Sequence, residues 1–256
     1  MKVGIFDSGI GGITVLKTAL RLLPQVDYIY YSDNNHVPYG TKSKEEVFGY
    51  VMQVVEFLIK EQVDAIVIAC NTATSIAVDA LRLRYSIPII GMEPAVKLAM
   101  DNLPKGKILV TATPLALKEE KYKRLVNGLG EQERIYSLAL PELVGFAENY
   151  MFDEKLIANY FHEKLAGFDL EEITGIVLGC THFVYFRKQL QSILPKHIQL
   201  FDGNEGTIKH LKELIVGSNE PLCYAYEKPR VTFYYSGQCC QDHTILERYL
   251  NLLEHT

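Results

Sequence analysis

The sequence AIVIACNT at residues 65–72 is an apolar run that ends in Cys70, followed by an amide and a hydroxyl side chain. The sequence GIVLGCTH at residues 175–182 has the same layout, with Cys180 in the equivalent place. Short apolar runs bounded by polar residues are typical of strands buried in a parallel sheet. The repeat therefore predicts two equivalent strands, each with a cysteine at its carboxyl end.

Strand and helix patterns alternate along the rest of the chain. Strands are expected at residues 2–6, 28–31, 64–69, 87–90, 107–111, 135–138, 175–178, 199–201 and 231–235. Helices are expected at residues 13–23, 44–61, 73–84, 118–127, 143–166, 185–193, 207–215 and 244–253. This alternation indicates parallel α/β sheets. We predict an α/β fold of two similar open-sheet domains related by pseudo-twofold symmetry, with the active site at their interface.

The chain of 256 residues is long enough for two compact domains. Residues 101–106 are polar and contain a proline and a glycine, so they favour a surface connection between the two halves. We predict that residues 1–96 and about 208–256 form the first domain, and that residues 97–207 form the second.

Composition and charge narrow the class of protein. The 26 Lys and Arg residues and the 31 Asp and Glu residues give a net charge of −5, which argues against general nucleic-acid binding. Residues 1–12 contain one Lys and are interrupted by Asp7, so they do not predict a signal peptide. No run of about 18 apolar residues predicts a membrane span. We therefore expect a cytoplasmic protein that binds neither nucleic acid nor membranes.

The chain has five cysteines, which are Cys70, Cys180, Cys223, Cys239 and Cys240. Their odd number, in a long chain without an export signal, argues against a disulfide framework. Without a CxxC pair or a paired Cys/His spacing, no metal site is expected. The last three cysteines lie outside any motif, and we interpret them as structural or incidental.

The positions of Cys70 and Cys180 at strand ends suggest that their thiols take part in a reaction. Open α/β sheets bind ligands at the carboxyl ends of their strands, and the following helix N-terminus favours a thiolate and lowers the pKa of a cysteine. Two thiols that face each other across a domain interface can invert a stereocentre without a cofactor. One removes a proton from one face of a carbon, and the other supplies a proton to the opposite face. The alternatives are two ordinary buried cysteines, or a redox pair, which needs the two sulfurs in contact.

Several motifs make a resemblance specific. They are GIFDSGIGG at 4–12, YSD at 31–33, VPYGT at 37–41, ACNTA at 69–73, GMEP at 91–94 and GCTHF at 179–183, with a weaker match at 202–203. In this order, the motifs resemble those of the glutamate racemases, cofactor-independent enzymes of the aspartate/glutamate racemase superfamily.

The resemblance implies a role for each catalytic residue. Cys70 and Cys180 would be the two acid/base catalysts, each serving one direction of racemisation. Asp7 would assist Cys70 and approach the substrate ammonium, and His182 would assist Cys180. The family glutamate near this histidine corresponds to Glu148. Two alternatives stay open, because Asp7 could be a helix cap and Glu148 an ordinary surface charge.

The resemblance also implies a substrate site without arginine, in which hydroxyl, amide and backbone N–H groups bind two carboxylates. The residues concerned are Asp7, Ser8, Pro38, Tyr39, Gly40, Cys70, Asn71, Thr72, Thr113, Cys180, Thr181 and His182. No metal, pyridoxal phosphate or flavin is expected. The segment SGIGG at 8–12 lacks the full GxGxxG spacing of a dinucleotide site, and no acidic residue ends the next strand, so we reject that interpretation.

The chain departs from the family pattern in places that affect substrate preference. In TATPLALKE at 111–119, Thr113 keeps one family hydroxyl, whereas Ala116 and Glu119 stand where the family has threonine and serine. Leu140 replaces a family cysteine before Pro141, and Ser32 replaces a common glycine. The loss of a hydroxyl could weaken glutamate binding or alter specificity.

We therefore expect a cytoplasmic, homodimeric racemase that interconverts L- and D-glutamate and supplies D-glutamate for peptidoglycan synthesis, as the family implies. Hinge motion is expected, because an interdomain site must admit and enclose its substrate. Two alternatives remain. One is an aspartate or other amino-acid racemase of the same superfamily. The other is a non-catalytic amino-acid-binding regulatory protein.

Overall fold

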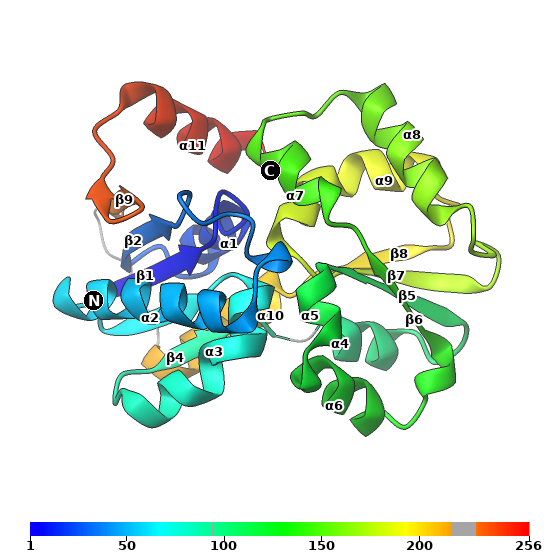
Figure 1. Cartoon of the computed structure of the whole chain (residues 1–256), viewed down its shortest axis with the longest axis horizontal. Coiled ribbons are helices and arrows are strands. Elements are labelled where there is room, and N and C mark those ends of the chain that lie inside the picture. The colour runs from blue at the N-terminus through cyan, green and yellow to red at the C-terminus, as the bar shows by residue number, and fades with distance from the viewer. Residues whose placement is uncertain (94, 217–228, 256) are drawn as a thin grey trace.

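The structure, a computed structural model of the whole chain, describes residues 1–93, 95–216 and 229–255 (Figure 1). Cys223 and Pro94, which the sequence analysis named, lie outside the described residues. Two sheets, each flanked by helices, lie side by side in Figure 1. This arrangement confirms the predicted α/β fold with two domains.

The first sheet has the strand order β10-β9-β2-β1-β3-β4. Its strands are β1 (Lys2–Asp7), β2 (Asp27–Ser32), β3 (Ala65–Ile68), β4 (Ile89–Gly91), β9 (Val231–Tyr235) and β10 (Gln238–Cys239). All pairs from β9 to β4 are parallel, and only β10 is antiparallel to its neighbour among the described strands. The side chains of β3 are fully buried, as expected for a strand covered on both faces.

The second sheet has the order β6-β5-β7-β8 and is parallel throughout. Its strands are β5 (Lys107–Ala112), β6 (Ile135–Ala139), β7 (Ile173–Leu178) and β8 (Gln199–Phe201). The first sheet contains the same order in β2-β1-β3-β4, so β3 corresponds to β7. Cys70 and Cys180 therefore follow equivalent strands, which confirms the prediction from the sequence repeat.

The helices connect these strands and pack on both faces of the sheets. They are α1 (Ile13–Leu22), α2 (Lys44–Lys60), α3 (Asn71–Arg84), α4 (Ala95–Asn102), α5 (Pro114–Lys118), α6 (Glu120–Gly128), α7 (Glu142–Glu148), α8 (Glu154–Leu165), α9 (Arg187–Ile193), α10 (Asn204–Val216) and α11 (His243–His255). The 3₁₀ helices among the described residues are η1 (Tyr39–Thr41), η2 (Gln132–Arg134) and η3 (Thr181–Phe186). No helix in the described parts of the chain is long and apolar enough to cross a membrane.

The two domains share one continuous hydrophobic cluster on one side of their interface. Ile10 and Ile13 at the start of α1 belong to it, together with Leu143 of α7 and Phe183 of η3. The chain passes from the first sheet to the second between β4 and α4, and it returns between β8 and α10, which packs on α1 (Figure 1). The proposed domain limits at 96/97 and 207/208 stay predictions.

The long helix expected at residues 143–166 is wrong, because the chain breaks it into α7 and α8. Tyr150 adopts a left-handed backbone conformation with φ 55°. Its N–H bonds the carbonyl of Ala147, and the N–H of Met151 bonds that of Phe146, which is the Schellman ending of a helix. The side chain of Asp153 then caps α8. The break places Glu148 at the end of a short helix.

Two further expectations need correction. The helix expected at 118–127 is divided, since Glu119 separates α5 from α6. Cys180 is followed by the 3₁₀ helix η3 before α9 begins, so the helix expected from residue 185 starts two residues later. Helix α4 and strand β10 have no counterpart in the predicted elements. Positive φ at Ser236 and Gly237 makes the tight turn that allows β10 to pair with β9.

Candidate active site at the domain interface

The two thiols occupy the carboxyl ends of corresponding strands. Cys70 is the N-cap of α3, and its sulfur accepts a hydrogen bond from the N–H of Ala73 at 3.5 Å. Cys180 lies between β7 and η3. The side chains are free thiols in residues that are 6% and 7% exposed, respectively. Ionisation of Cys180 would raise the pKa of Cys70, so the two thiols are close enough to interact electrostatically.

The lower thiol pKa expected at a helix N-terminus is wrong for Cys70. Burial raises its pKa well above the ordinary value, and the nearby charge of Asp7 raises it further. The hydrogen bond from Ala73 opposes these effects but does not outweigh them. Cys70 is therefore held as a neutral thiol until a neighbouring group accepts its proton.

His182 is placed between Cys180 and two carboxylates. Its Nδ1 lies 3.8 Å from the sulfur of Cys180 and 3.9 Å from Oδ2 of Asp7, and its Nε2 lies 2.5 Å from Oε1 of Glu148. Burial by itself lowers the pKa of His182. The contacts with Cys180 and Glu148 and the charge of Asp7 outweigh burial and raise the pKa well above its ordinary range.

Asp7 is fully buried at the end of β1, and its two carboxylate oxygens differ. Oδ2 accepts a hydrogen bond from the N–H of Gly12 at 2.8 Å, which is the local capping contact that the sequence left open. Oδ1 has no hydrogen-bond partner among the described residues. Burial raises the pKa of Asp7, although His182 acts in the opposite direction. One oxygen is thus available for a cation or a proton.

The glycine segment after β1 is a contact surface for the second domain. A Cβ on Gly9 would collide with the carboxylate of Glu148, and a Cβ on Gly11 would collide with the ring of His182. The N–H of Ile10 donates to Oε1 of Glu148 at 2.8 Å. Glycine is required here because the His182 and Glu148 side chains approach the backbone closely, which provides a structural reason for the motif. Glu148 is therefore part of the buried interface and not an ordinary surface charge.

The expected substrate-binding residues come together from both domains. The hydroxyl of Ser8 lies 4.0 Å from the sulfur of Cys70. The hydroxyls of Thr72 and Thr113 are 2.9 Å apart, so they connect the start of α3 to the start of α5. A Cβ on Gly40 would collide with the side chain of Thr113. The Pro38–Gly40 turn therefore lies directly against Thr113, next to the Thr72–Thr113 contact.

Three of the expected residues have more specific positions. Asn71 is the first residue of α3, directly after Cys70. Thr181 lies beside the backbone of Gly11, because a Cβ added to Gly11 would be only 2.5 Å from the Thr181 hydroxyl. The hydroxyl of Tyr39 donates to Asp33 at 2.5 Å, so it is engaged within the first domain.

Sequence reasoning missed several residues that support this arrangement. The hydroxyls of Tyr30 and Tyr185 donate to the carbonyls of Gly9 and Ile10 at 2.6 Å and 2.7 Å, respectively. The side-chain N–H of Asn34 reaches Glu148 at 3.5 Å. These residues lie in ordinary strand, loop and 3₁₀ segments, and no motif marks them. Their contribution depends on contacts between segments distant in sequence.

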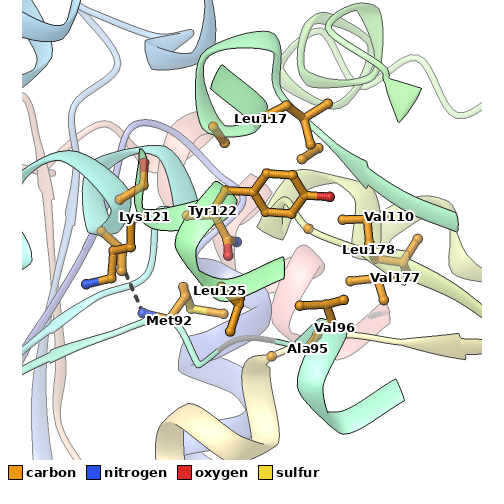
Figure 2. Close-up of a pocket in the computed structure, with 17 residues that line it drawn as sticks. Met92, Ala95, Val96, Val110, Leu117, Lys121, Tyr122, Leu125, Val177 and Leu178 are labelled. Atoms are coloured by element: carbon orange, nitrogen blue, oxygen red, sulfur yellow. Dashed lines mark hydrogen bonds between the residues drawn. The ribbon is translucent and has the colours of Figure 1, made fainter. Parts of the chain in front are cut away.

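A cavity of about 110 Å³ lies next to the site (Figure 2). Asn71 and Gly179, the chain neighbours of the two cysteines, form part of its wall. Most of the remaining wall is apolar, and it includes Ala116, where the family pattern has a threonine. In Figure 2 the ring of Tyr122 extends towards Val110 and Leu178. The cavity is thus an apolar space behind the polar groups, not a second polar site.

No group of three or more His, Cys, Asp or Glu side chains that could hold a metal ion occurs within residues 1–93, 95–216 and 229–255. The titratable groups at the interface are instead arranged as neighbours of the two thiols. Asp7 and His182 each lie where they can exchange a proton with a nearby group. The arrangement can therefore carry out acid–base chemistry on a small molecule held between the domains.

The two corresponding α/β domains each place one buried thiol at the carboxyl end of a strand, Cys70 after β3 and Cys180 after β7. This arrangement is that of an enzyme with an acid–base site between its domains. The chain belongs to the Asp/Glu/Hydantoin racemase family, whose profile matches residues 14–211. It is therefore an isomerase of the racemase type. The chain is similar in sequence to several glutamate racemases. The glutamate racemase of Halothermothrix orenii is 50% identical over 254 residues, which cover 99% of each chain. Glutamate racemase 2 of Bacillus subtilis is 43% identical over 256 residues, covering 99% of this chain and 96% of the relative.

Solved structures agree with this assignment. Glutamate racemase from Campylobacter jejuni has a TM-score of 0.86 and 28% identity, covering 99% of this chain and 98% of that one. The Francisella tularensis glutamate racemase, solved in complex with D-glutamate, has a TM-score of 0.83 and 30% identity, covering 98% and 93%. The likeness to an aspartate racemase from Picrophilus torridus, at 16% identity and a TM-score of 0.56 over 83% of this chain and 93% of that one, is evidence of the fold alone.

Proposed function

We propose that this protein interconverts L-glutamate and D-glutamate by proton transfer at the alpha carbon between two thiols. The observation that carries the proposal is the placement of Cys70 and Cys180 at corresponding strand ends in one buried interdomain site. Glutamate as substrate is supported by the relatives, one of which was solved with D-glutamate and another, from Escherichia coli, with L-glutamate.

The proposed reaction needs one thiolate and one thiol at the start. The thiolate takes the proton from the alpha carbon, and the electron pair of the broken C–H bond remains on that carbon. The opposite thiol then donates its proton to the other face of the carbon and becomes the thiolate. The substrate configuration is inverted, no electrons are gained or lost, and the protonation states of the two sulfurs are exchanged.

The neighbours of the thiols supply the starting thiolate. Burial holds Cys70 neutral, so its proton must pass to a nearby acceptor, and Asp7 is the carboxylate that interacts with it most strongly. In the second domain, His182 contacts the sulfur of Cys180 through Nδ1 and forms a hydrogen bond with the carboxylate of Glu148 through Nε2. The free oxygen of Asp7 also suits the alpha-ammonium group of an amino acid, whose positive charge would favour a thiolate beside it.

Substrate carboxylates would be held by neutral donors. Helix α3 begins at Asn71, directly after Cys70, and the N–H groups of a first helical turn favour anions. Ser8, Thr72, Thr113 and Thr181 add hydroxyl groups from both domains. We assign these residues, with the Pro38–Gly40 turn, to substrate binding.

We further propose that the protein acts as a homodimer in the cytoplasm and supplies D-glutamate for peptidoglycan synthesis. Reduced thiols persist in that compartment, which two-thiol chemistry requires. Light scattering after size-exclusion chromatography measures the oligomeric state. A mass of one chain at micromolar concentration would contradict the dimer.

The function is tested by incubating the purified protein with L-glutamate or D-glutamate in deuterium oxide. Circular dichroism follows racemisation, and proton NMR follows exchange at the alpha carbon. We expect both signals with either enantiomer, and we expect Cys70→Ser and Cys180→Ser to abolish racemisation. Cys240→Ser is the control, because Cys240 lies outside the site. Racemisation of aspartate in preference to glutamate, or binding of glutamate without exchange, would contradict the proposal.

A further inference from the structure

The ion pair between Lys44 and Glu119 joins the two domains beside the site. Nζ of Lys44, the first residue of α2, lies 2.8 Å from Oε2 of Glu119, which separates α5 from α6. The Glu119 side chain is 9% exposed, whereas that of Lys44 is 52% exposed. Burying an ionised carboxylate is unfavourable unless a partner compensates for the lost solvation. Lys44 is that partner, and it comes from the other domain.

The ion pair adjoins the segments that we assign to substrate binding. Lys44 follows η1, whose Gly40 packs against Thr113, and Thr113 is the N-cap of α5, the helix that leads to Glu119. Ser43 caps α2 through a reciprocal pair of hydrogen bonds with Glu46, which fixes the backbone that carries Lys44. The ion pair and the contact between Gly40 and Thr113 therefore lie on the same side of the domain interface.

The two sides of the interface differ in how the domains are joined. On the side of α1, α7 and η3, the continuous hydrophobic cluster crosses the interface. On the side of η1 and α5, the hydrogen bonds and ion pairs between the domains are Thr72 with Thr113, Lys44 with Glu119 and Lys121 with Asp79. One partly buried apolar residue of α5, Leu115, also packs against the core of the first domain. Because the thiols are only 6% and 7% exposed, a substrate needs the domains to separate. Fewer apolar side chains cross the interface here than in the continuous cluster, so this side is the one that opens with less loss of apolar burial.

We propose that Lys44 and Glu119 form an interdomain latch that holds the domains closed over the site. A contact that exists only in the closed arrangement shifts the equilibrium towards that arrangement. Lys121 and Asp79 form a second interdomain pair at 3.1 Å on this side, but both are well exposed, so it contributes little. The latch itself is independent of the reaction, and only its kinetic consequence rests on the proposed function.

The first test measures closure without using activity. Iodoacetamide alkylation of Cys70 and Cys180 is followed by mass spectrometry, with the exposed Cys239 as the internal reference. We expect Glu119→Gln, and separately Lys44→Met, to increase alkylation of both buried thiols about two- to fivefold, the effect of one partly buried ion pair on a two-state equilibrium. Alkylation of Cys239 should not change.

Glu120→Gln is the matched control for this test. Glu120 is the chain neighbour of Glu119, and it pairs with Lys123 within the second domain. Alkylation in this variant should stay within about 1.5-fold of wild type, because Glu120 is exposed, its direct partner Lys123 belongs to the same domain, and Lys44 acts on it only as a weaker, more distant charge. Equal alkylation of wild type, Glu119→Gln and Lys44→Met would overturn the latch. Lys44 is half exposed, so its variant remains informative if Glu119→Gln does not fold.

The second test reverses the charges. In the double variant with Lys44→Glu and Glu119→Lys, we expect the alkylation rates to return to within about twofold of wild type, because the attraction is restored. In the racemase assay, the single variants should raise KM for glutamate several-fold while kcat changes less. An unrestored double variant would contradict the latch. Absent racemisation with the expected alkylation pattern would count against the proposed function alone.

Discussion

Oε1 of Glu148 lies 2.5 Å from Nε2 of His182 and also accepts the backbone N–H of Ile10 at 2.8 Å. Glu148 and His182 belong to the second domain, whereas Ile10 belongs to the glycine segment of the first. The carboxylate that orients the imidazole is therefore itself held by the opposite domain. The protonation of His182, and through it the state of Cys180, depends on the two domains being together.

Replacing Glu148 tests this dependence. Glu148→Gln removes a charge that raises the pKa of His182, so the imidazole should be protonated only at lower pH. We expect kcat to fall about 10- to 100-fold, less than the full contribution of a general acid–base group, with a shifted pH–rate profile. Glu142→Gln is the control on the same helix, since Glu142 pairs with Lys164 away from the thiols. Equal pH profiles for wild type and Glu148→Gln would contradict this role.

The raised pKa of His182 also predicts pH-dependent stability. The folded chain binds the imidazole proton more tightly than the unfolded chain, in which histidine titrates near about pH 6.5. The resulting stabilisation is fully present below that pH and is lost as the pH rises through the folded-state pKa. Chemical denaturation should thus show a free-energy difference between wild type and His182→Gln that shrinks above about pH 6.5. A difference that grows with pH would exclude this linkage.

Asp7→Asn separates two effects of the same carboxylate. The charge of Asp7 raises the pKa of Cys70, so its removal should shift Cys70 alkylation to lower pH. The variant also loses the proposed proton acceptor, and kcat should fall about 100-fold or more. Alkylation measured against pH, together with racemisation kinetics, checks both results. If alkylation moved to higher pH, the assigned contact between Asp7 and Cys70 would be wrong.

Gly11→Ala tests the close packing of the glycine segment. The new Cβ would collide with His182 and Thr181, so we expect a loss of stability of about 1–3 kcal/mol and a loss of activity of tenfold or more. Gly145→Ala in α7 is the matched control, because open space surrounds that position. It should stabilise the chain by about 0.5–1 kcal/mol. Thermal unfolding and racemisation assays distinguish the two variants, and equal behaviour would refute the packing argument.

The fold could be predicted from sequence because its strongest patterns are local. Each apolar run ends in a cysteine and polar residues, and these features lie within eight consecutive residues around Cys70 and Cys180. The two halves of the chain share this local pattern, so the strand order β2-β1-β3-β4 of the first sheet recurs as β6-β5-β7-β8 in the second. Glu148 could be named only through the resemblance, and its contact with His182 became visible once the two domains were placed together.

Other features depend on contacts that no local pattern contains. The left-handed Tyr150 that ends α7 is not a glycine, so sequence alone predicted one long helix. The pKa of Cys70 follows from its burial in the folded chain and from the charge of Asp7, which together outweigh the local hydrogen bond from Ala73 at the start of α3. The latch residue Glu119 was noticed as a departure from the family pattern, but its partner Lys44 lies far away in the chain.

The two corresponding thiols have unlike neighbours, a carboxylate beside Cys70 and a His–Glu pair beside Cys180. For the proposed reaction, substrate and product are mirror images with equal free energy in water, so the equilibrium constant between them is unity. The Haldane relation then requires equal kcat/KM in the two directions, however unequal the chemistry on the two faces. An asymmetric site can therefore have different kcat and different KM values for the two enantiomers, provided that the ratio kcat/KM is the same for both. Any substitution at Asp7 or His182 must therefore change both efficiencies by the same factor.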